Sequence, residues 1–158
     1  MDNGNDLVYF VNSQGKKAIL SSPDNRHLWE LRGRTGFTAP KYDLFYEKFA
    51  SGKTYYFGKS LQPRTPTMKM VCVGKDSAER DRIFFDMVDT LMDINETDEG
   101  KLYIKRFDGV MVYLKCVYSS GLDITEEYKK LHKFTLEFFA ADPLYYQVSD
   151  PTKTFLGA

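Results

Sequence analysis

The 158-residue sequence predicts a single α+β domain, mainly antiparallel β in a sandwich-like or split-barrel-like arrangement, with one amphipathic helix. Three observations predict this class. Apolar residues recur at helical spacing near 77–95, and two alternating strands flank an Asp-Gly pair in a β-hairpin at 101–118. A strand with period-two alternation at 133–139 runs into Asp142-Pro143, where the missing proline N–H ends it. The aromatic content of 15% also favours strands.

Short strands separated by turn residues make up the first part of the chain. An Asn-Ser-Gln-Gly turn at 12–15 joins the first two strands into a hairpin. The linker at 58–64 suits a hairpin-like connection between the last two. The predicted strands are 7–11, 17–20, 27–32, 53–57 and 65–73.

Residues 33–52 alternate glycine, proline and aromatic residues without a firm period. We interpret this segment mostly as a loop or an arm. The aromatic residues Tyr42, Phe45, Tyr46 and Phe49 lie at helix-like spacing, which also allows a short amphipathic turn.

The predicted helix begins after Asp76, which is placed to accept backbone N–H groups, while Glu79 is placed to reach back as in a capping box. Its apolar face carries Ile83, Phe84, Met87, Val88, Leu91 and Ile94. Its opposite face carries Asp86, Asp89, Asp93 and Glu96. Because the helix dipole disfavours acidic residues toward the C-terminal end, this face is either solvated or covered by a basic partner surface.

The last third of the chain adds the hairpin and the closing strand. We interpret residues 119–130 as a polar connection and residues 147–158 as a polar tail. The closing strand places its apolar residues on one face, as a half-buried strand does. The predicted core residues of the helix and this strand are Phe84, Met87, Val88, Leu91, Phe134, Leu136 and Phe138.

The charge balance argues against a dedicated nucleic-acid binder, because 22 basic residues meet 22 acidic ones. The charges are unevenly placed. Residues 1–74 carry 11 basic and 6 acidic residues, a net +5, and residues 75–158 carry 11 and 16, a net −5. This asymmetry is either chance plus a solvated acidic helix, or it indicates head-to-tail association that closes into a ring.

Cysteine usage and the termini indicate a protein made in a cytoplasm. Cys72 and Cys116 each lie in an apolar strand-like run, as buried free thiols do, and the alternative of a disulfide stays open. The polar N-terminus has no apolar signal core, and no apolar run reaches membrane-spanning length. We therefore expect no membrane insertion.

No catalytic, metal-binding or cofactor-binding pattern stands out in the sequence. Neither His27 nor His132 has metal-ligand spacing, and the nucleophile, phosphate-loop and dinucleotide patterns are lacking. We therefore predict that the protein is not an enzyme and needs no cofactor or metal. The mixture of lysines and aromatics at 53–64 leaves an oligonucleotide-binding barrel as an alternative, although Tyr55 and Phe57 on one face fit a core or an interface better.

Several short motifs follow one another in a fixed order. They are Tyr9-Phe-Val-Asn-Ser-Gln-Gly-Lys-Lys17, Gly52-Lys-Thr-Tyr55, Glu79-Arg-Asp-Arg82, Gly100-Lys-Leu-Tyr103 and Phe134-Thr-Leu-Glu-Phe-Phe-Ala-Ala-Asp-Pro-Leu-Tyr-Tyr146. Together they resemble the N-terminal domain of the distal tail protein (Dit) family of long-tailed, siphovirus-type bacteriophages and prophages. The resemblance covers about 7–146, and its most specific part is the Phe-x-Ala-x-Asp-Pro-x-Tyr type of ending.

The resemblance implies a structural protein of the virion tail tip, six copies of which form a ring. The ring joins the tail tube protein to a tail hub or tail-associated lysin-type protein and to receptor-binding proteins, and it is assembled in the host cytoplasm. On this basis residues 1–146 are the ring-forming domain. Residues 147–158 are a tail or the start of a linker to a second, galectin-like domain that many family members carry. A tail tube protein is the alternative within phage tails.

Because the family has inter-subunit arms, the segment 33–52 becomes a candidate arm. The charge asymmetry likewise makes the acidic helix face a candidate subunit surface. The predicted interface residues are Phe37, Tyr42, Phe45, Tyr46, Asp86, Asp89 and Asp93.

Overall fold

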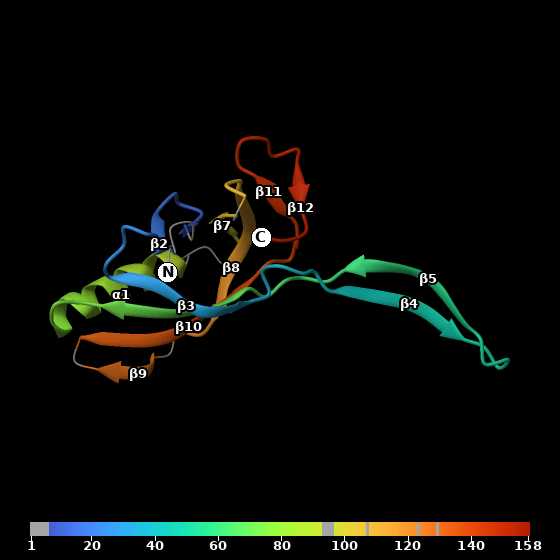
Figure 1. Cartoon of the computed structure of the whole chain (residues 1–158), viewed down its shortest axis with the longest axis horizontal. Coiled ribbons are helices and arrows are strands. Elements are labelled where there is room, and N and C mark those ends of the chain that lie inside the picture. The colour runs from blue at the N-terminus through green and yellow to red at the C-terminus, as the bar shows by residue number, and fades with distance from the viewer. Residues whose placement is uncertain (1–6, 93–96, 107, 123, 129) are drawn as a thin grey trace.

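The computed structural model describes residues 7–92, 97–106, 108–122, 124–128 and 130–158. It consists of a compact body and a long two-stranded arm that projects from the body (Figure 1). In chain order the elements are β1 Val8–Val11, β2 Lys17–Ser21, β3 Leu28–Thr35, β4 Tyr42–Lys48, β5 Thr54–Leu61, β6 Thr67–Val73, α1 Ser77–Leu91, β7 Gly100–Lys105, β8 Met111–Ser120, β9 Ile124–Tyr128, β10 Leu131–Phe139, β11 Tyr145–Gln147 and β12 Thr154–Phe155.

The body is a single antiparallel sheet that curls into a nearly closed barrel. Seven strands follow the order β2-β1-β7-β8-β10-β6-β3, β9 adds to β10, and β11 with β12 adds to β8. The end strands β2 and β3 are joined by a short turn and lie against each other, which brings the two edges of the sheet together. The predicted class, α+β with mainly antiparallel strands and one helix, is confirmed.

The core fills the inside of this barrel, and the seven predicted core residues all contribute to it. Six of them are buried, and Val88 is partly buried and packs against the others. The closing strand β10 alternates as predicted, with its even-numbered apolar residues inward. The residues that line the core most deeply are Val8, Phe10, Leu20, Met68, Met70, Leu102, Ile104, Leu114, Phe134, Leu136, Phe138 and Tyr145.

Helix α1 packs against β1, β2, β6 and β10, and begins where the sequence predicts. The side chain of Asp76 accepts a hydrogen bond from the backbone N–H of Glu79, at 2.9 Å. The helix ends at Leu91, four residues before the predicted end, because Met92 is in an extended conformation (φ −87°, ψ 91°). Residues 93–96 lie outside the described residues.

The predicted hairpin at 101–118 is confirmed, with β7 and β8 paired around Asp108-Gly109, where Gly109 has φ +84°. The polar connection predicted at 119–130 is wrong in part, because it contains the edge strand β9, paired with β10. The segment 33–52, interpreted as mostly a loop or an arm, does form part of an arm, but not as a loop: β3 extends to Thr35 and β4 occupies 42–48.

The pairing of β5 differs from the prediction as well. We expected residues 53–57 to pair with 65–73, but β5 continues through Gly58 to Leu61 and pairs with β4 in a separate two-stranded sheet. The helical turn suggested by the spacing of Tyr42 to Phe49 is therefore wrong. Neither face of this sheet is buried, so nothing enforces the period-two pattern that would have revealed its strands.

Residues 147–158, predicted to be a tail or a linker, pack onto the body. Strand β12 pairs with β11, and the backbone N–H of Ala158 donates to the carbonyl of Phe37, at 3.1 Å. Cys72 and Cys116 are free and buried, as predicted. No helix in the described part of the chain has both the length and the apolar character needed to cross a membrane.

Candidate interaction site: the β4–β5 arm and its root

The arm is a β-hairpin whose side chains are mostly exposed along both strands. Strands β4 and β5 pair from Tyr42–Leu61 to Lys48–Thr54, and the turn between them closes with the Gly52 N–H donating to the Phe49 carbonyl at 2.9 Å. A bulge interrupts the pairing next to Phe45, so that Phe57 is the extra residue on β5.

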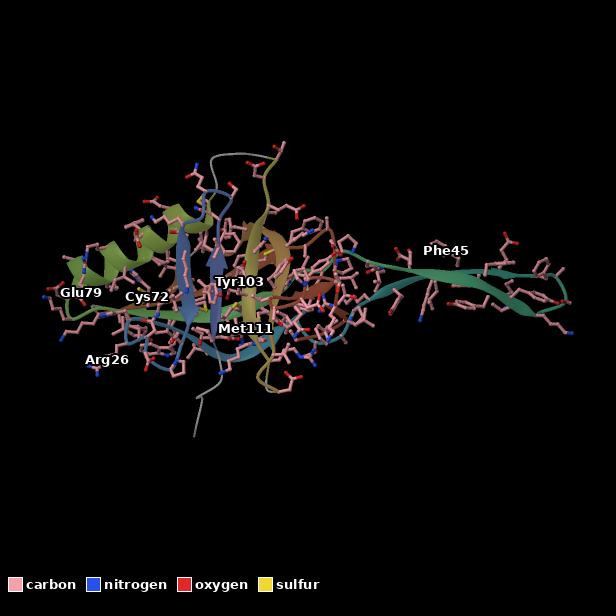
Figure 2. The ribbon with its side chains drawn as sticks, turned by 90° about the horizontal axis from the view of Figure 1, so that it is seen from above. Arg26, Phe45, Cys72, Glu79, Tyr103 and Met111 are labelled. Carbon is pink, nitrogen blue, oxygen red and sulfur yellow. The ribbon has the colours of Figure 1, made fainter. Side chains whose placement is uncertain are left out.

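Large apolar side chains cover this arm and have no core to enter. The most exposed are Tyr46 and Phe57, at 62% and 63% of their surface. Because Phe45 and Tyr46 are neighbours on one strand, they lie on opposite faces, so the apolar surface occurs on both sides of the arm. Figure 2 shows Phe45 on the arm, far from the body. The exposed apolar residues of the arm are Leu44, Phe45, Tyr46, Phe49, Tyr55, Tyr56 and Phe57.

Contacts within the arm organise only part of this surface. The rings of Phe49 and Tyr55 meet edge to face, with centroids 4.8 Å apart. The ammonium group of Lys59 lies 4.3 Å from the centroid of the Tyr42 ring. A two-stranded hairpin is marginally stable alone in water, so these contacts leave the arm dependent on its root and on whatever covers it.

Arg64 fastens the root of the arm to the body. The side chain is only 5% exposed, and one guanidinium nitrogen donates to the Phe37 carbonyl at 2.6 Å. The other terminal nitrogen donates to the Leu156 carbonyl. The guanidinium also lies over the Tyr145 ring, 4.8 Å from its centroid. One buried cation therefore joins the chain entering the arm, strand β11 and the C-terminal segment.

Tyr145 completes this junction. Its hydroxyl donates to the Phe37 carbonyl at 2.9 Å. Burial raises the pKa of Tyr145 to about 12, an effect that the charge of Arg64 partly opposes. The hydroxyl is therefore protonated at neutral pH and available as a donor.

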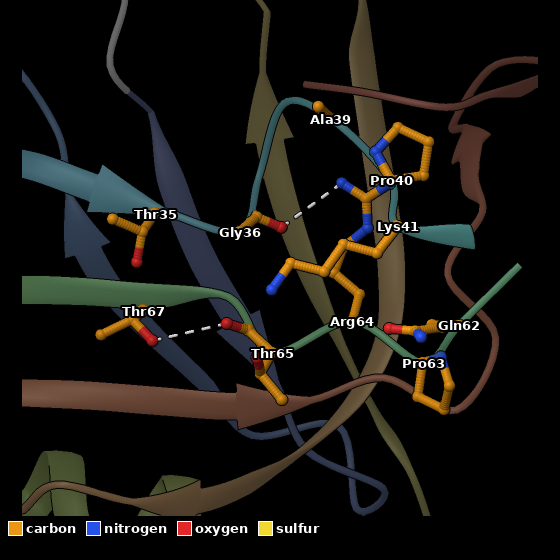
Figure 3. A pocket seen from close by; sticks show the side chains of 10 residues that line it. All are labelled: Thr35, Gly36, Ala39, Pro40, Lys41, Gln62, Pro63, Arg64, Thr65 and Thr67. Carbon is orange, nitrogen blue, oxygen red and sulfur yellow. Dashed lines mark hydrogen bonds between the residues drawn. The ribbon is translucent and has the colours of Figure 1, made fainter. Parts of the chain in front are cut away.

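At the root, the backbone of the segment that enters the arm packs closely against the backbone of the segment that returns from it. Gly36 has φ +77°, and a Cβ there would lie 2.6 Å from the Thr65 carbonyl oxygen. Between the outgoing and returning segments lies a pocket of about 510 Å³, which Figure 3 shows with Gly36, Lys41 and Arg64 around it. The whole lining is Thr35, Gly36, Ala39, Pro40, Lys41, Gln62, Pro63, Arg64, Thr65 and Thr67.

The structure places the predicted interface residues in three different settings. Tyr42, Phe45 and Tyr46 lie on the arm. Phe37 does not, and this prediction needs correction: it is 1% exposed in the core, because the chain between β3 and β4 turns inward at the root before it leaves the body.

Of the predicted acidic residues, Asp86 and Asp89 are exposed on α1, far along the chain from the arm. Asp93 lies outside the described residues. Sequence reasoning missed the role of Arg64, for which no local signal exists. For Tyr55 and Phe57 it left a core or an interface open, and the structure exposes both, together with Tyr56.

The two histidines take part in local contacts on the body. His132 is buried, and its Nε2 lies 2.9 Å from Asp81 Oδ1, which also accepts from Arg80. The hydrogen bonds from His132, first, and from Arg80 hold the pKa of Asp81 below its usual range. His27 Nδ1 lies 3.1 Å from the Val73 carbonyl oxygen.

These groups do not assemble into a nucleophilic site. Cys72 pairs with His132 across β6 and β10, but burial raises the pKa of this thiol to about 11, so it is protonated at neutral pH. Within the described residues no group of three or more histidine, cysteine or acidic side chains could hold a metal ion.

The body and arm together define a fold class that occurs in solved phage structures, although no family model and no curated protein matches the sequence. The fold is Dit-like. The chain is similar to the crystal structure of SPP1 Dit, described as a paradigm of the hub adsorption apparatus in phages that infect Gram-positive bacteria. The TM-score is 0.64 at 16% identity, over 89% of this chain and 52% of that one.

Two structures of the phage P2 baseplate in its activated conformation are similar as well. The structure with Ca gives a TM-score of 0.65 at 10% identity, over 85% of this chain and 43% of that chain. The structure with Sr gives 0.64 at 11% identity, over 85% and 44%. This chain thus spans about half the length of the chains that it matches, and at these identities the likeness shows the fold.

Proposed function

We propose that this protein is a structural component of a phage tail tip or baseplate hub, which acts by assembling into a ring of identical subunits, expected to be a hexamer. Its partners would be the tail tube protein, a tail hub or tail-associated lysin-type protein, and a receptor-binding protein. The ring would be assembled in the host cytoplasm and end at the virion tail tip, without catalysis, membrane insertion or sequence-specific nucleic-acid binding.

The observation that carries this proposal is the arm. Seven large apolar side chains are exposed on a hairpin that forms its own sheet and buries neither face. Exposed apolar surface of this size on one element marks an interaction site. The hub described for SPP1 Dit supports reading the partner as a tail component.

The reach of the arm suits a ring. The arm extends far from the body (Figure 1), so it can contact the body of another copy, a surface unlike its own. When each copy gives its arm to one neighbour and receives the arm of another, the contact is heterologous and closes into a ring or continues as a filament. Interdigitated arms in a symmetric dimer would bury one arm against the other and leave the body uninvolved.

The experiment removes three of the seven exposed apolar side chains of the arm without touching the core. In the variant Phe45→Ser/Tyr46→Ser/Phe57→Ser, all three changed side chains are more than half exposed. We expect the natural chain to form a discrete oligomer in sedimentation velocity and light scattering, and the variant to be a folded monomer. The control variant Phe139→Ser/Val148→Ser changes two exposed apolar residues of the body and should assemble as the natural chain does.

Three results would contradict the proposal in different ways. If the natural chain stays monomeric at high concentration, the proposal that it forms a ring is wrong. Open-ended growth with concentration would favour the tail tube alternative. Tight, salt-sensitive binding of single-stranded DNA that the arm variant loses would favour the oligonucleotide-binding alternative.

A further inference from the structure

The outer surface of the barrel carries an unusual ladder of tyrosines. Tyr9, Tyr103, Tyr113 and Tyr146 lie in one register across β1, β7, β8 and β11. Their ring centroids are 4.7, 5.6 and 5.5 Å apart from strand to strand. The rings lean against one another, so the ladder turns ring edges and hydroxyl groups outward more than ring faces.

Lysines accompany the ladder. Their ammonium groups lie 4.0 to 5.0 Å from ring centroids: Lys17 over Tyr9, Lys101 over Tyr113 and Lys115 over Tyr146. Strands β1, β2, β7 and β8 contain four lysines and no acidic residue. We call the four tyrosines and these three lysines the tyrosine–lysine face. The three ammonium groups make this face basic, although the Tyr146 hydroxyl already donates to Asp142, and the contacts between lysines and rings disfavour base stacking.

A second unpartnered surface lies on helix α1. Phe85 and Met92 are exposed at 58% and 55%, although both are large and apolar. Asp86 and Asp89 are exposed on the same outward side of the helix. Asp86 also pairs with Lys16 at 3.1 Å, but both groups are exposed, and such surface pairs contribute little to stability. We call these four residues the α1 stripe.

We propose that the α1 stripe of one copy docks on the tyrosine–lysine face of the next copy. This inference rests on the ring proposed above and names a second contact within it. The stripe offers two carboxylates and two apolar side chains, one of them a methionine. The face offers ammonium groups and tyrosine edges, which suit carboxylates, Phe85 and the Met92 sulfur. Figure 2 shows Tyr103 and Met111 on the strands of the body, away from the arm.

The two surfaces are unlike and lie on different elements of the chain, so each copy can offer its stripe to one neighbour and its face to another, which is the heterologous contact that a ring uses. The choice of a second copy over another partner rests on this complementarity in both charge and apolar content. The protein has no net charge at neutral pH, which removes any general repulsion between copies. Among the described helix residues, the stripe is also the place where apolar and acidic groups are exposed together.

A charge-exchange experiment tests the pairing. Lys101→Glu/Lys115→Glu reverses the face, and Asp86→Lys/Asp89→Lys reverses the stripe. Each double variant should keep its melting temperature and raise the dissociation constant of the oligomer about ten-fold or more. The chain with all four changes should regain most of the assembly, because both partners are then reversed. As a control, Lys69→Glu/Lys153→Glu reverses two exposed lysines elsewhere and should assemble normally.

Several results separate this inference from the proposed ring. If the arm variant dissociates but both reversals assemble normally, the docking of the α1 stripe is wrong and the ring stands. If both double variants dissociate and the chain with all four changes does not assemble either, the two surfaces do not contact each other. A natural chain that never assembles would remove both proposals. Binding of oligothymidylate that Lys101→Glu/Lys115→Glu abolishes would instead assign the face to a nucleic acid.

Discussion

Removal of the Arg64 side chain should destabilise the whole domain and release the arm from the body. The guanidinium donates to the carbonyls of Phe37 and Leu156. Hydrogen bonds from a charged donor contribute about 1.5–3 kcal/mol each. Part of this gain is offset because the buried charge loses its hydration. We expect Arg64→Ala to lower the free energy of unfolding by about 3–4 kcal/mol, including lost packing on Tyr145.

A second substitution separates the packing of the side chain from its hydrogen bonds. Arg64→Met keeps the length of the stem and removes the charge. The Phe37 carbonyl still accepts from the Tyr145 hydroxyl at 2.9 Å and from the Ala158 N–H at 3.1 Å. The Leu156 carbonyl then loses its donor, and the Gly36 carbonyl loses a longer contact from the guanidinium at 3.4 Å. The expected loss is therefore about 1–2 kcal/mol.

Thermal unfolding followed by circular dichroism measures both losses. For a domain of this size, the shifts correspond to about 10 °C for Arg64→Ala and about 4 °C for Arg64→Met. Arg26→Ala removes an exposed arginine of the body and should stay within about 0.5 kcal/mol of the natural chain. If Arg64→Ala has the same melting temperature as the Arg26→Ala control, the contacts of Arg64 do not stabilise the root of the arm. If Arg64→Met is the less stable of the two variants at this position, the hydrogen-bond accounting is wrong.

The remaining predictions concern the backbone, acid stability and the thiols. Gly36→Ala should lower the midpoint of urea unfolding far more than Gly52→Ala, because both glycines have positive φ but only Gly36 has a carbonyl oxygen within 2.6 Å of the new Cβ. The depressed pKa of Asp81 gives stability above about pH 4 that is lost as the pH falls through the folded-state value, so Asp81→Asn should flatten acid unfolding curves. An unchanged curve would contradict that. Cys72 and Cys116, whose thiol pKa values burial raises, should react with a disulfide reagent at pH near 8 only after unfolding.

The body was largely predictable because its residues are buried on one side. One-sided burial imposes a period of two on strands and of 3.6 on the helix, and both periods appear in β10 and α1. The capping residue Asp76 and the Asp-Gly turn added local chemistry that pointed to the same elements. The seven predicted core residues consequently all lie in or against the core.

The arm and its root were not predictable in this way. Arg64 reads as an ordinary linker residue, and only the tertiary structure brings Phe37, Tyr145 and Leu156 around it. The tyrosine–lysine face was equally hidden. Two of its residues come from the first 20 positions and the rest from beyond residue 100, so the charge difference between the two halves of the sequence does not describe the surface.

The contrast between body and arm has a physical cause that bears on assembly. Burial of side chains imposes a regular apolar pattern on the sequence, and in the body the side chains are buried by other parts of the same chain. In the arm, Leu44, Phe45 and Tyr46 are consecutive and all exposed, so alternation is absent and both faces stay apolar. A strand that will be covered on one side only gains solubility from polar residues on the other side. Apolar residues on both faces instead suit a strand that is enclosed from both sides, as in a slot between two neighbouring subunits. The arm is folded by its own pairing and by Arg64, and in the proposed ring its exposed apolar residues would be covered by other copies.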